Sequence, residues 1–169
     1  MSEAQDGVLR EIDFPQSSVG APLPHVIADE DHLIIAYLVE VPNPDWDGRT
    51  IKLVGPATDD EVVAIVKVQR YLAFQFGPPN DEAIRGHRLF GLGLVPYSSF
   101  EVLNSSWLAA LETANRVHRY HTAERYARYR HVVLTFHDST LEFIGESWSV
   151  QLERGSVREA LLAAATALD

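Results

Sequence analysis

Residues His118–Glu142 read HRYHTAERYARYRHVVLTFHDSTLE, and the second half of this segment gives the clearest indication of the fold class. The apolar run Val132–Phe136 and the run Leu141–Val150 are separated by the polar pair Asp138-Ser139, which predicts a β-hairpin. Four of the seven histidines of the chain also lie here, among a dense group of arginines. The segment therefore combines the clearest hairpin of the chain with its densest group of ionisable side chains.

On the N-terminal side of this segment, the sequence changes character at residue 25. Residues 1–24 mix charged residues and serines with three prolines, and we expect them to form an irregular arm. The runs Val26–Ala28 and Leu33–Val39, separated by an acidic turn, predict a second hairpin. Glu61–Phe76 is rich in valine, isoleucine and aromatic residues and predicts the longest strand.

Residues with good capping side chains mark the predicted helices. These are Asn104 or Ser105 before a helix that reaches about Val117, Thr122 before residues 123–129, and Ser156 before residues 157–168. Many strands, few helices and no regular βαβ alternation indicate the α+β class. We expect a single domain over residues 25–169 with a mostly antiparallel sheet and two or three helices.

The composition is that of a globular protein with little attraction for polyanions. Hydrophobic residues make up 46% and charged residues 22%, and the net charge of −10 argues against whole-surface binding to nucleic acid or anionic membrane. The chain has no cysteine, which excludes disulfides and thiol nucleophiles. The N-terminal residues lack the apolar core of a secretory signal, and no apolar run approaches the roughly 20 residues of a membrane span. We expect a soluble, cytoplasmic protein.

The hairpin predicts one candidate catalytic group. With a two-residue turn, His137 pairs with Thr140 and Thr135 pairs with Glu142, which places these side chains on one polar face with Asp138 at the tip. A histidine diagonal to a carboxylate suits acid–base chemistry because the carboxylate fixes the imidazole tautomer. The candidate catalytic residues are therefore His137, Asp138 and Glu142. The alternative is an exposed hairpin tip in which Asp138 closes its own turn.

A second candidate is a metal site. His118 and His121 are three residues apart, and both imidazoles share a face if the preceding helix continues by one turn. With His137 or Asp138 they would supply three or four ligands suited to zinc or iron. The alternative is that histidines near a helix C-terminus are favoured by the helix dipole alone. We expect no cofactor other than a divalent metal at this set.

The basic segment is also a candidate binding surface. Its arginines alternate with Tyr120, Tyr126 and Tyr129, a mixture that suits phosphate contacts and base stacking. Acidic residues are plentiful elsewhere, and pairs such as Glu112 with Arg116 can be ordinary surface ion pairs, so nucleic acid is not favoured. A small anion or an acidic partner protein suits the surface equally well.

Signatures of other enzyme classes are absent from the sequence. Ser105 and Ser106 precede a helix without the G-x-S-x-G pattern of a nucleophile elbow, so we interpret them as capping residues. The glycines at 91 and 93 lack the rest of a dinucleotide fingerprint or P-loop.

An ordered set of short motifs between residues 70 and 146 resembles a family of bacterial proteins of unknown function. The motifs are Pro79-Asn80-Asp81-Glu82-Ala83, Gly86-His87, Phe100-Glu101-Val102 with Asn104-Ser105 and Trp107, Asn115 with His118 and His121, and Phe136-His137-Asp138-Ser139-Thr140 with Glu142. Leu141 stands where the family pattern leads us to expect phenylalanine. The resemblance implies no catalytic roles, but it brings polar residues at element ends into one pattern. With the basic segment, it gives the candidate binding residues His87, Asn115, Arg116, His118, Arg119 and His121.

Two functional hypotheses follow, and the sequence leaves open whether the protein is an enzyme. The first is a binding or regulatory domain whose surface of histidine, arginine and tyrosine holds an acidic partner or a small anion. The second is a metal-assisted hydrolase with His118, His121 and His137 as ligands. Open edge strands of an antiparallel sheet are also compatible with a homodimer.

Overall fold

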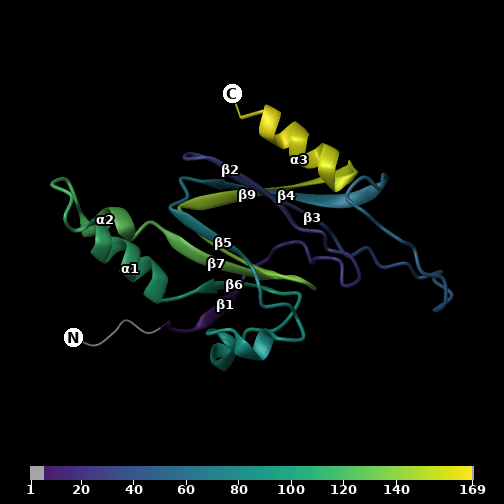
Figure 1. The fold of residues 1–169 in the computed structure, drawn as a ribbon, viewed down its shortest axis with the longest axis horizontal. Helices are drawn as coiled ribbons and strands as arrows, with labels where there is room; N and C mark the ends of the chain where they lie inside the picture. Colours follow the sequence, from purple (N-terminus) through teal and green to yellow (C-terminus); the bar gives the residue numbers. More distant parts are fainter. Residues whose placement is uncertain (1–5, 169) are drawn as a thin grey trace. The chain divides into compact units, whose positions relative to one another are not determined.

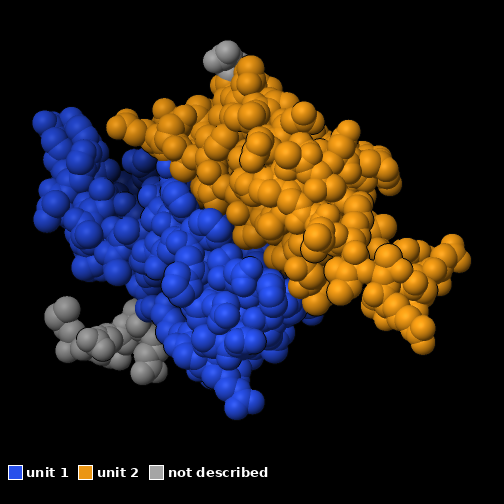
Figure 2. All heavy atoms as spheres, turned by 45° about the vertical axis from the view of Figure 1, so that its right-hand side comes forward, with its two compact units in different colours: residues 1–13, 68–148 blue, residues 14–67, 149–169 orange. Residues whose placement is uncertain are grey.

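The computed structural model describes residues 6–168, and its contacts divide the chain into two compact units, which Figure 2 shows in different colours. Unit 1 comprises Met1–Asp13 and Val68–Trp148, and unit 2 comprises Phe14–Lys67 and Ser149–Asp169. The described chain contains three α-helices and two antiparallel sheets. The predicted α+β class is therefore confirmed, although two sheets form where we expected one.

Unit 1 contains a five-stranded sheet in the order β1-β6-β7-β8-β5. The strands are β1 (Leu9–Glu11), β5 (Ala73–Gly77), β6 (Ser99–Val102), β7 (Arg130–Thr135) and β8 (Thr140–Gly145). Each strand is antiparallel to its neighbour. Helices α1 (Ser106–Asn115) and α2 (Ala123–Tyr126) lie together near one end of these strands (Figure 1).

One face of this sheet is covered by a segment with little regular structure. The segment contains two short 3₁₀ helices, η1 (Ile84–Gly86) and η2 (Phe90–Leu92), drawn in teal beside β1 and β6 in Figure 1. Its buried side chains form an apolar cluster with the sheet, made of Ile84, Leu89, Leu94, Val102 and Val133. Because this cluster excludes water, polar side chains on the same sheet face need partners within the protein.

The predicted hairpin around residue 138 forms, but its register differs from our expectation. Thr135 pairs with Thr140 and Val133 pairs with Glu142, so the connection has four residues rather than two. The loop is closed by a hydrogen bond from the Phe136 N–H to the Ser139 carbonyl (2.8 Å). His137 therefore lies in the loop rather than on the strand, and its predicted pairing with Thr140 is wrong.

Unit 2 is built on a four-stranded sheet in the order β2-β3-β4-β9. The elements are β2 (His25–Ala28), β3 (Leu33–Leu38), β4 (Glu61–Gln69), β9 (Ser147–Gly155) and helix α3 (Val157–Thr166). Every residue of β3 is buried, and α3 packs against β2 and β3 (Figure 1). The core is formed by Ile34, Ala36, Leu38, Val63 and Ile65 from the strands and by Val157, Ala160, Leu161 and Ala164 from α3. The predicted β2–β3 hairpin is confirmed.

Several element boundaries differ from the sequence prediction. The predicted strand Glu61–Phe76 is divided into β4 and β5, which belong to different sheets. The division falls at Arg70, which has a left-handed φ of 49° that a strand does not accommodate. The segment expected to be an irregular arm supplies β1, which pairs with β6. Within residues 6–168, none of the helices has the length and apolar character needed to cross a bilayer.

The caps of two helices give a matched test of local stability. The Ser156 hydroxyl accepts a hydrogen bond from the Glu159 N–H (3.2 Å), whereas the Thr122 side chain makes no such bond to α2. Replacing Ser156 by Ala should lower the free energy of unfolding by about 1 kcal/mol, because one N–H of the first turn loses its acceptor. Thr122→Ala should change it by less than about 0.5 kcal/mol. Urea denaturation measures both, and equal effects would contradict the assignment.

Candidate functional site

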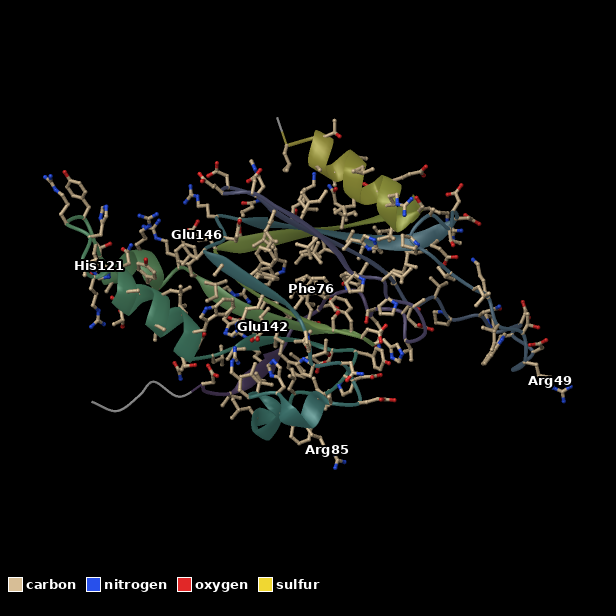
Figure 3. All side chains as sticks on the ribbon, viewed as in Figure 1. Arg49, Phe76, Arg85, His121, Glu142 and Glu146 are labelled. Atoms are coloured by element: carbon tan, nitrogen blue, oxygen red, sulfur yellow. The ribbon has the colours of Figure 1, made fainter. Side chains whose placement is uncertain are left out.

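A group of buried polar side chains in unit 1 surrounds Glu142 on β8. Because Val133 pairs with Glu142 and His131 pairs with Ile144, the side chains of His131 and Glu142 lie on the same sheet face as diagonal neighbours. Both side chains are buried, with 0% of His131 and 7% of Glu142 exposed. Figure 3 shows Glu142 inside unit 1. The hairpin face that we expected to be polar is thus buried at Glu142.

Three cationic or imidazole groups approach the Glu142 carboxylate. Arg88 donates to Oε2 at 2.6 Å and His131 Nε2 lies 2.8 Å from the same oxygen. His87 Nε2 lies 3.4 Å from Oε1. Arg88 also reaches the Asp6 carboxylate at 3.4 Å, so it joins two carboxylates. We call Glu142, His87, Arg88 and His131 the Glu142 cluster.

The surroundings of Glu142 keep it ionised. Burial by itself raises the pKa of the carboxyl, but the hydrogen bonds from His131 and His87 and the charge of Arg88 outweigh it and lower the pKa to about 2. Glu142 is therefore a fixed negative charge at neutral pH. It is suited to orienting an imidazole and is too weakly basic to serve as a general base itself.

The hydrogen bonds around the two imidazoles define their tautomers. An ionised carboxylate only accepts hydrogen bonds, so the proton of neutral His131 lies on Nε2, facing Glu142. His87 Nδ1 accepts a hydrogen bond from the Leu89 N–H (3.2 Å), which places the proton of neutral His87 on Nε2, also facing Glu142. Both histidines therefore point N–H groups at the carboxylate.

His137 belongs to a different group, at the tip of the β7–β8 loop. Its Nδ1 lies 2.9 Å from the Asp81 carboxylate and 2.8 Å from the Tyr97 hydroxyl, which donates to the same carboxylate at 2.5 Å. The hydrogen bond to Asp81 raises the pKa of His137. Asp138 is 87% exposed and lies 3.9 Å from His137 Nε2. Of the predicted catalytic residues, His137 and Asp138 lie close to each other, whereas Glu142 belongs to the Glu142 cluster.

The predicted binding residues near α1 form two further small groups. Glu112 on α1 accepts a hydrogen bond from Arg116 (2.7 Å) and lies 2.8 Å from His121 Nε2. These two partners lower the pKa of Glu112, with Arg116 making the larger contribution. Arg119 lies over the ring of Tyr120 at 4.4 Å, and the exposed His118 ring lies beside the same tyrosine. Asn115, the last residue of α1, is exposed.

The three histidines of the predicted metal set are not brought together. Helix α1 ends at Asn115, so His118 and His121 do not share the helical face that the hypothesis requires. His121 contacts Glu112, and His137 contacts Asp81. In Figure 3, His121 lies well away from Glu142. Across residues 6–168 there is no group of three or more histidine, aspartate or glutamate side chains that could hold a metal ion.

A cleft lined by arginines lies beside α2 in unit 1. Its volume is about 410 Å³, and its lining residues are Arg70, Thr122, Arg125, Arg128, Tyr129 and Glu146. Arg70 and Arg128 approach Glu146 at 2.9 and 3.9 Å. Arg125 forms no ion pair with any residue that the structure describes. We call this group the arginine cleft; Figure 3 labels Glu146 at its position near α2.

Several residues of these sites were not among the candidate site residues predicted from the sequence. Arg88 and His131 complete the Glu142 cluster, and Arg70 completes the arginine cleft. His131 begins a strand and shares the period-two face of Glu142, so the correct hairpin register would have identified it. Arg88 and Arg70 lie on segments that meet their partners only through the fold, and no local pattern indicates them.

Searches of protein-family models, curated proteins and solved structures find no match to this chain. The resemblance to bacterial proteins of unknown function therefore stays a prediction.

The lowered pKa of Glu142 predicts how stability depends on acid. Its contribution is fully present above its ordinary pKa of 4.5 and is lost as the pH falls towards about 2, a shift equivalent to about 3 kcal/mol. Between pH 5 and pH 2, the wild type should therefore lose about 3 kcal/mol more unfolding free energy than Glu142→Gln. The control is Glu124→Gln, at an exposed position without an ion pair to the described residues. Parallel wild-type and Glu142→Gln curves in urea denaturation would refute this account.

The raised pKa of His137 predicts an opposite dependence at higher pH. Protonated His137 contributes to the free energy of unfolding through its bond to Asp81. This contribution is fully present below pH 6.5 and is lost as the pH rises through the raised pKa of His137. Replacing Asp81 by Asn should return the pKa of His137 towards 6.5, because the accepting carboxylate is lost. An NMR titration of the imidazole measures this shift. Asp138→Asn is the control and should have a much smaller effect, because Asp138 is exposed and more distant.

Proposed function

We propose that the protein binds a small anion, such as a phosphorylated or carboxylated metabolite, in the arginine cleft. The observation that carries the proposal is the guanidinium of Arg125, which forms no ion pair within residues 6–168 and lies beside Arg70 and Arg128 in one concave site. Three guanidinium groups face a single carboxylate, Glu146, so the cleft is locally positive in a chain whose net charge is −10. Such a concentration of positive charge attracts an anionic ligand.

Arginine is the side chain best suited to this kind of ligand. Its planar guanidinium donates two parallel hydrogen bonds to a carboxylate or phosphate, and these are stronger than bonds between neutral groups. The hydroxyl of Thr122, at the edge of the cleft, adds a donor of the kind that often accompanies arginine at anion sites. The cleft therefore offers charge and directional donors together.

Glu146 supports the proposal by ordering the cleft before a ligand arrives. It pairs with Arg70, from the turn before β5, and with Arg128, from the connection between α2 and β7. The Glu146 side chain is only 20% exposed, whereas Arg70 and Arg128 keep 71% and 66% of their side chains exposed. The carboxylate thus holds two long side chains near one place while leaving their donors accessible. Preorganisation of this kind lowers the entropy cost of binding.

The size of the cleft favours a small molecule over a protein partner. A volume of about 410 Å³ falls within the range of roughly 300–1,000 Å³ that small-molecule sites occupy. Tyr129, which lines the cleft, is buried and contacts the ring of Tyr126, so this part of the wall is fixed by aromatic packing. A concave site with a firm wall suits a compact anion better than the broad acidic surface of a protein.

Isothermal titration calorimetry with pyrophosphate and citrate at low ionic strength tests this proposal. We expect binding to the wild type and a loss of about tenfold or more in affinity for Arg125→Ala, because one charge-assisted contact worth about 1.5–3 kcal/mol disappears. Raising the salt concentration should weaken binding through screening.

The matched control is Arg85→Ala. Arg85 is an exposed arginine of η1 that makes no ion pair with the described part of the chain and does not line the cleft, so the variant makes the same change in net charge elsewhere in unit 1. It should retain wild-type affinity. If neither anion binds at millimolar concentration, or if Arg85→Ala weakens binding as much as Arg125→Ala, the proposal is wrong.

A further inference from the structure

We infer that Ser105, His131 and Glu142 form a nucleophile–base–carboxylate relay for acyl transfer, an activity beyond anion binding. The Ser105 hydroxyl lies 2.7 Å from His131 Nδ1, and His131 Nε2 lies 2.8 Å from the Glu142 carboxylate. The three residues come from the N-terminus of α1, from β7 and from β8. This is the arrangement in which a base activates a hydroxyl and a third group orients the base.

The hydrogen bonds of His131 are directed so that its Nδ1 can accept the proton of the Ser105 hydroxyl. Because Glu142 only accepts, the proton of neutral His131 is on Nε2, and Nδ1 presents a lone pair to Ser105. The Ser105 oxygen also accepts a hydrogen bond from the Leu108 N–H (3.0 Å), so its own proton is available to His131. The hydroxyl therefore caps the helix and donates to a base at the same time.

The backbone around Ser105 is a sharp connection between a strand and a helix. β6 ends at Val102, Asn104 has a left-handed φ of 55°, and α1 begins directly after Ser105. Asparagine is one of the few non-glycine residues that adopt this conformation readily, and here it lets the chain turn directly from the strand into the helix that Ser105 caps. The positive end of the α1 dipole at Ser105 favours the negative charge that develops on a carbonyl oxygen during attack.

A pocket of suitable size adjoins the relay. Its volume is about 590 Å³, and both Ser105 and His131 line it. Apolar and aromatic residues make up much of its wall, including Leu103, Leu108, Ala109 and Tyr126. Its two carboxylates, Glu101 and Glu112, are each paired with arginine. The pocket therefore suits an uncharged acyl group, and we assign an ester as the substrate class.

Ester hydrolysis by this relay uses water as the second substrate. The Ser105 oxygen forms a bond to the acyl carbon while its proton passes to His131 Nδ1. The tetrahedral intermediate then collapses, and the departing alkoxide takes that proton and leaves as an alcohol. Water attacks the acyl-serine, gives a proton through His131 back to Ser105, and releases the carboxylic acid. No electron acceptor or donor is needed.

Glu142 and Trp107 are positioning residues in this scheme. The fixed charge of Glu142 holds the tautomer of His131 and stabilises the imidazolium that forms during attack. The Trp107 ring packs edge-on against the His131 ring with centroids 5.2 Å apart, which restricts rotation of the imidazole. Arg88 and His87, on the other side of Glu142, keep its charge in place.

Covalent labelling with a small alkyl fluorophosphonate tests the inference on the whole protein. Intact-mass and peptide analysis should find one adduct, on Ser105, and p-nitrophenyl acetate should be hydrolysed. Ser105→Gly should give no adduct and should still fold, because glycine is tolerated at a helix N-cap. Ser106→Ala removes the neighbouring hydroxyl and should keep full labelling. An unlabelled, folded wild type, or an adduct on another residue, would overturn the inference.

The role of Glu142 has its own readout. Glu142→Gln should slow labelling by about a hundredfold or more at every pH at which the variant remains folded, and Glu142→Asp should recover part of the rate. A purely structural role would change the unfolding free energy and leave the labelling rate of the folded protein unchanged. Anion binding at the arginine cleft is measured without the probe, so failure of one proposal does not decide the other.

Discussion

Burying the carboxylate of Glu142 beneath residues 84–94 would be costly if donors did not surround it. Arg88, in residues 84–94, and His131, on the neighbouring strand β7, both donate hydrogen bonds to this carboxylate. The contact between Arg88 and Glu142 joins residues that are 54 positions apart in the chain. A segment with little regular structure is thereby tied to the sheet by charge as well as by its apolar side chains.

The Glu142 cluster and the arginine cleft, both in unit 1, differ in how far their charges are compensated. In the Glu142 cluster, donors outnumber the buried carboxylate and leave it fully compensated. In the arginine cleft, guanidinium groups outnumber Glu146, and Arg125 has no carboxylate partner among the described residues. A compensated charge can orient a neighbouring group, whereas an excess charge facing solvent can attract a ligand. The two proposals rest on this difference.

Ser105 illustrates how one contact can serve both structure and chemistry. Its hydroxyl accepts a backbone N–H of α1, which is the ordinary reason for serine at this position. Its bond to His131 Nδ1 has a different origin, because it depends on where β7 places a histidine relative to the end of β6. Capping explains the first contact and does not require the second. The second contact, together with the adjoining pocket, is what indicates catalysis.

Features that depend on neighbouring residues could be predicted from the sequence. The caps Ser105 and Ser156, the β2–β3 hairpin and the α+β class follow from contacts within a few positions and from apolar periodicity. The register of the β7–β8 hairpin did not follow, because Asp138-Ser139 is not one of the residue pairs that fix a two-residue turn, and the strands are joined by four residues instead. That register moved His137 off the strand and placed His131 beside Glu142. The Glu142 cluster and the arginine cleft could not be predicted in this way, because the partners and the burial of their charged side chains depend on segments that are far apart in the chain.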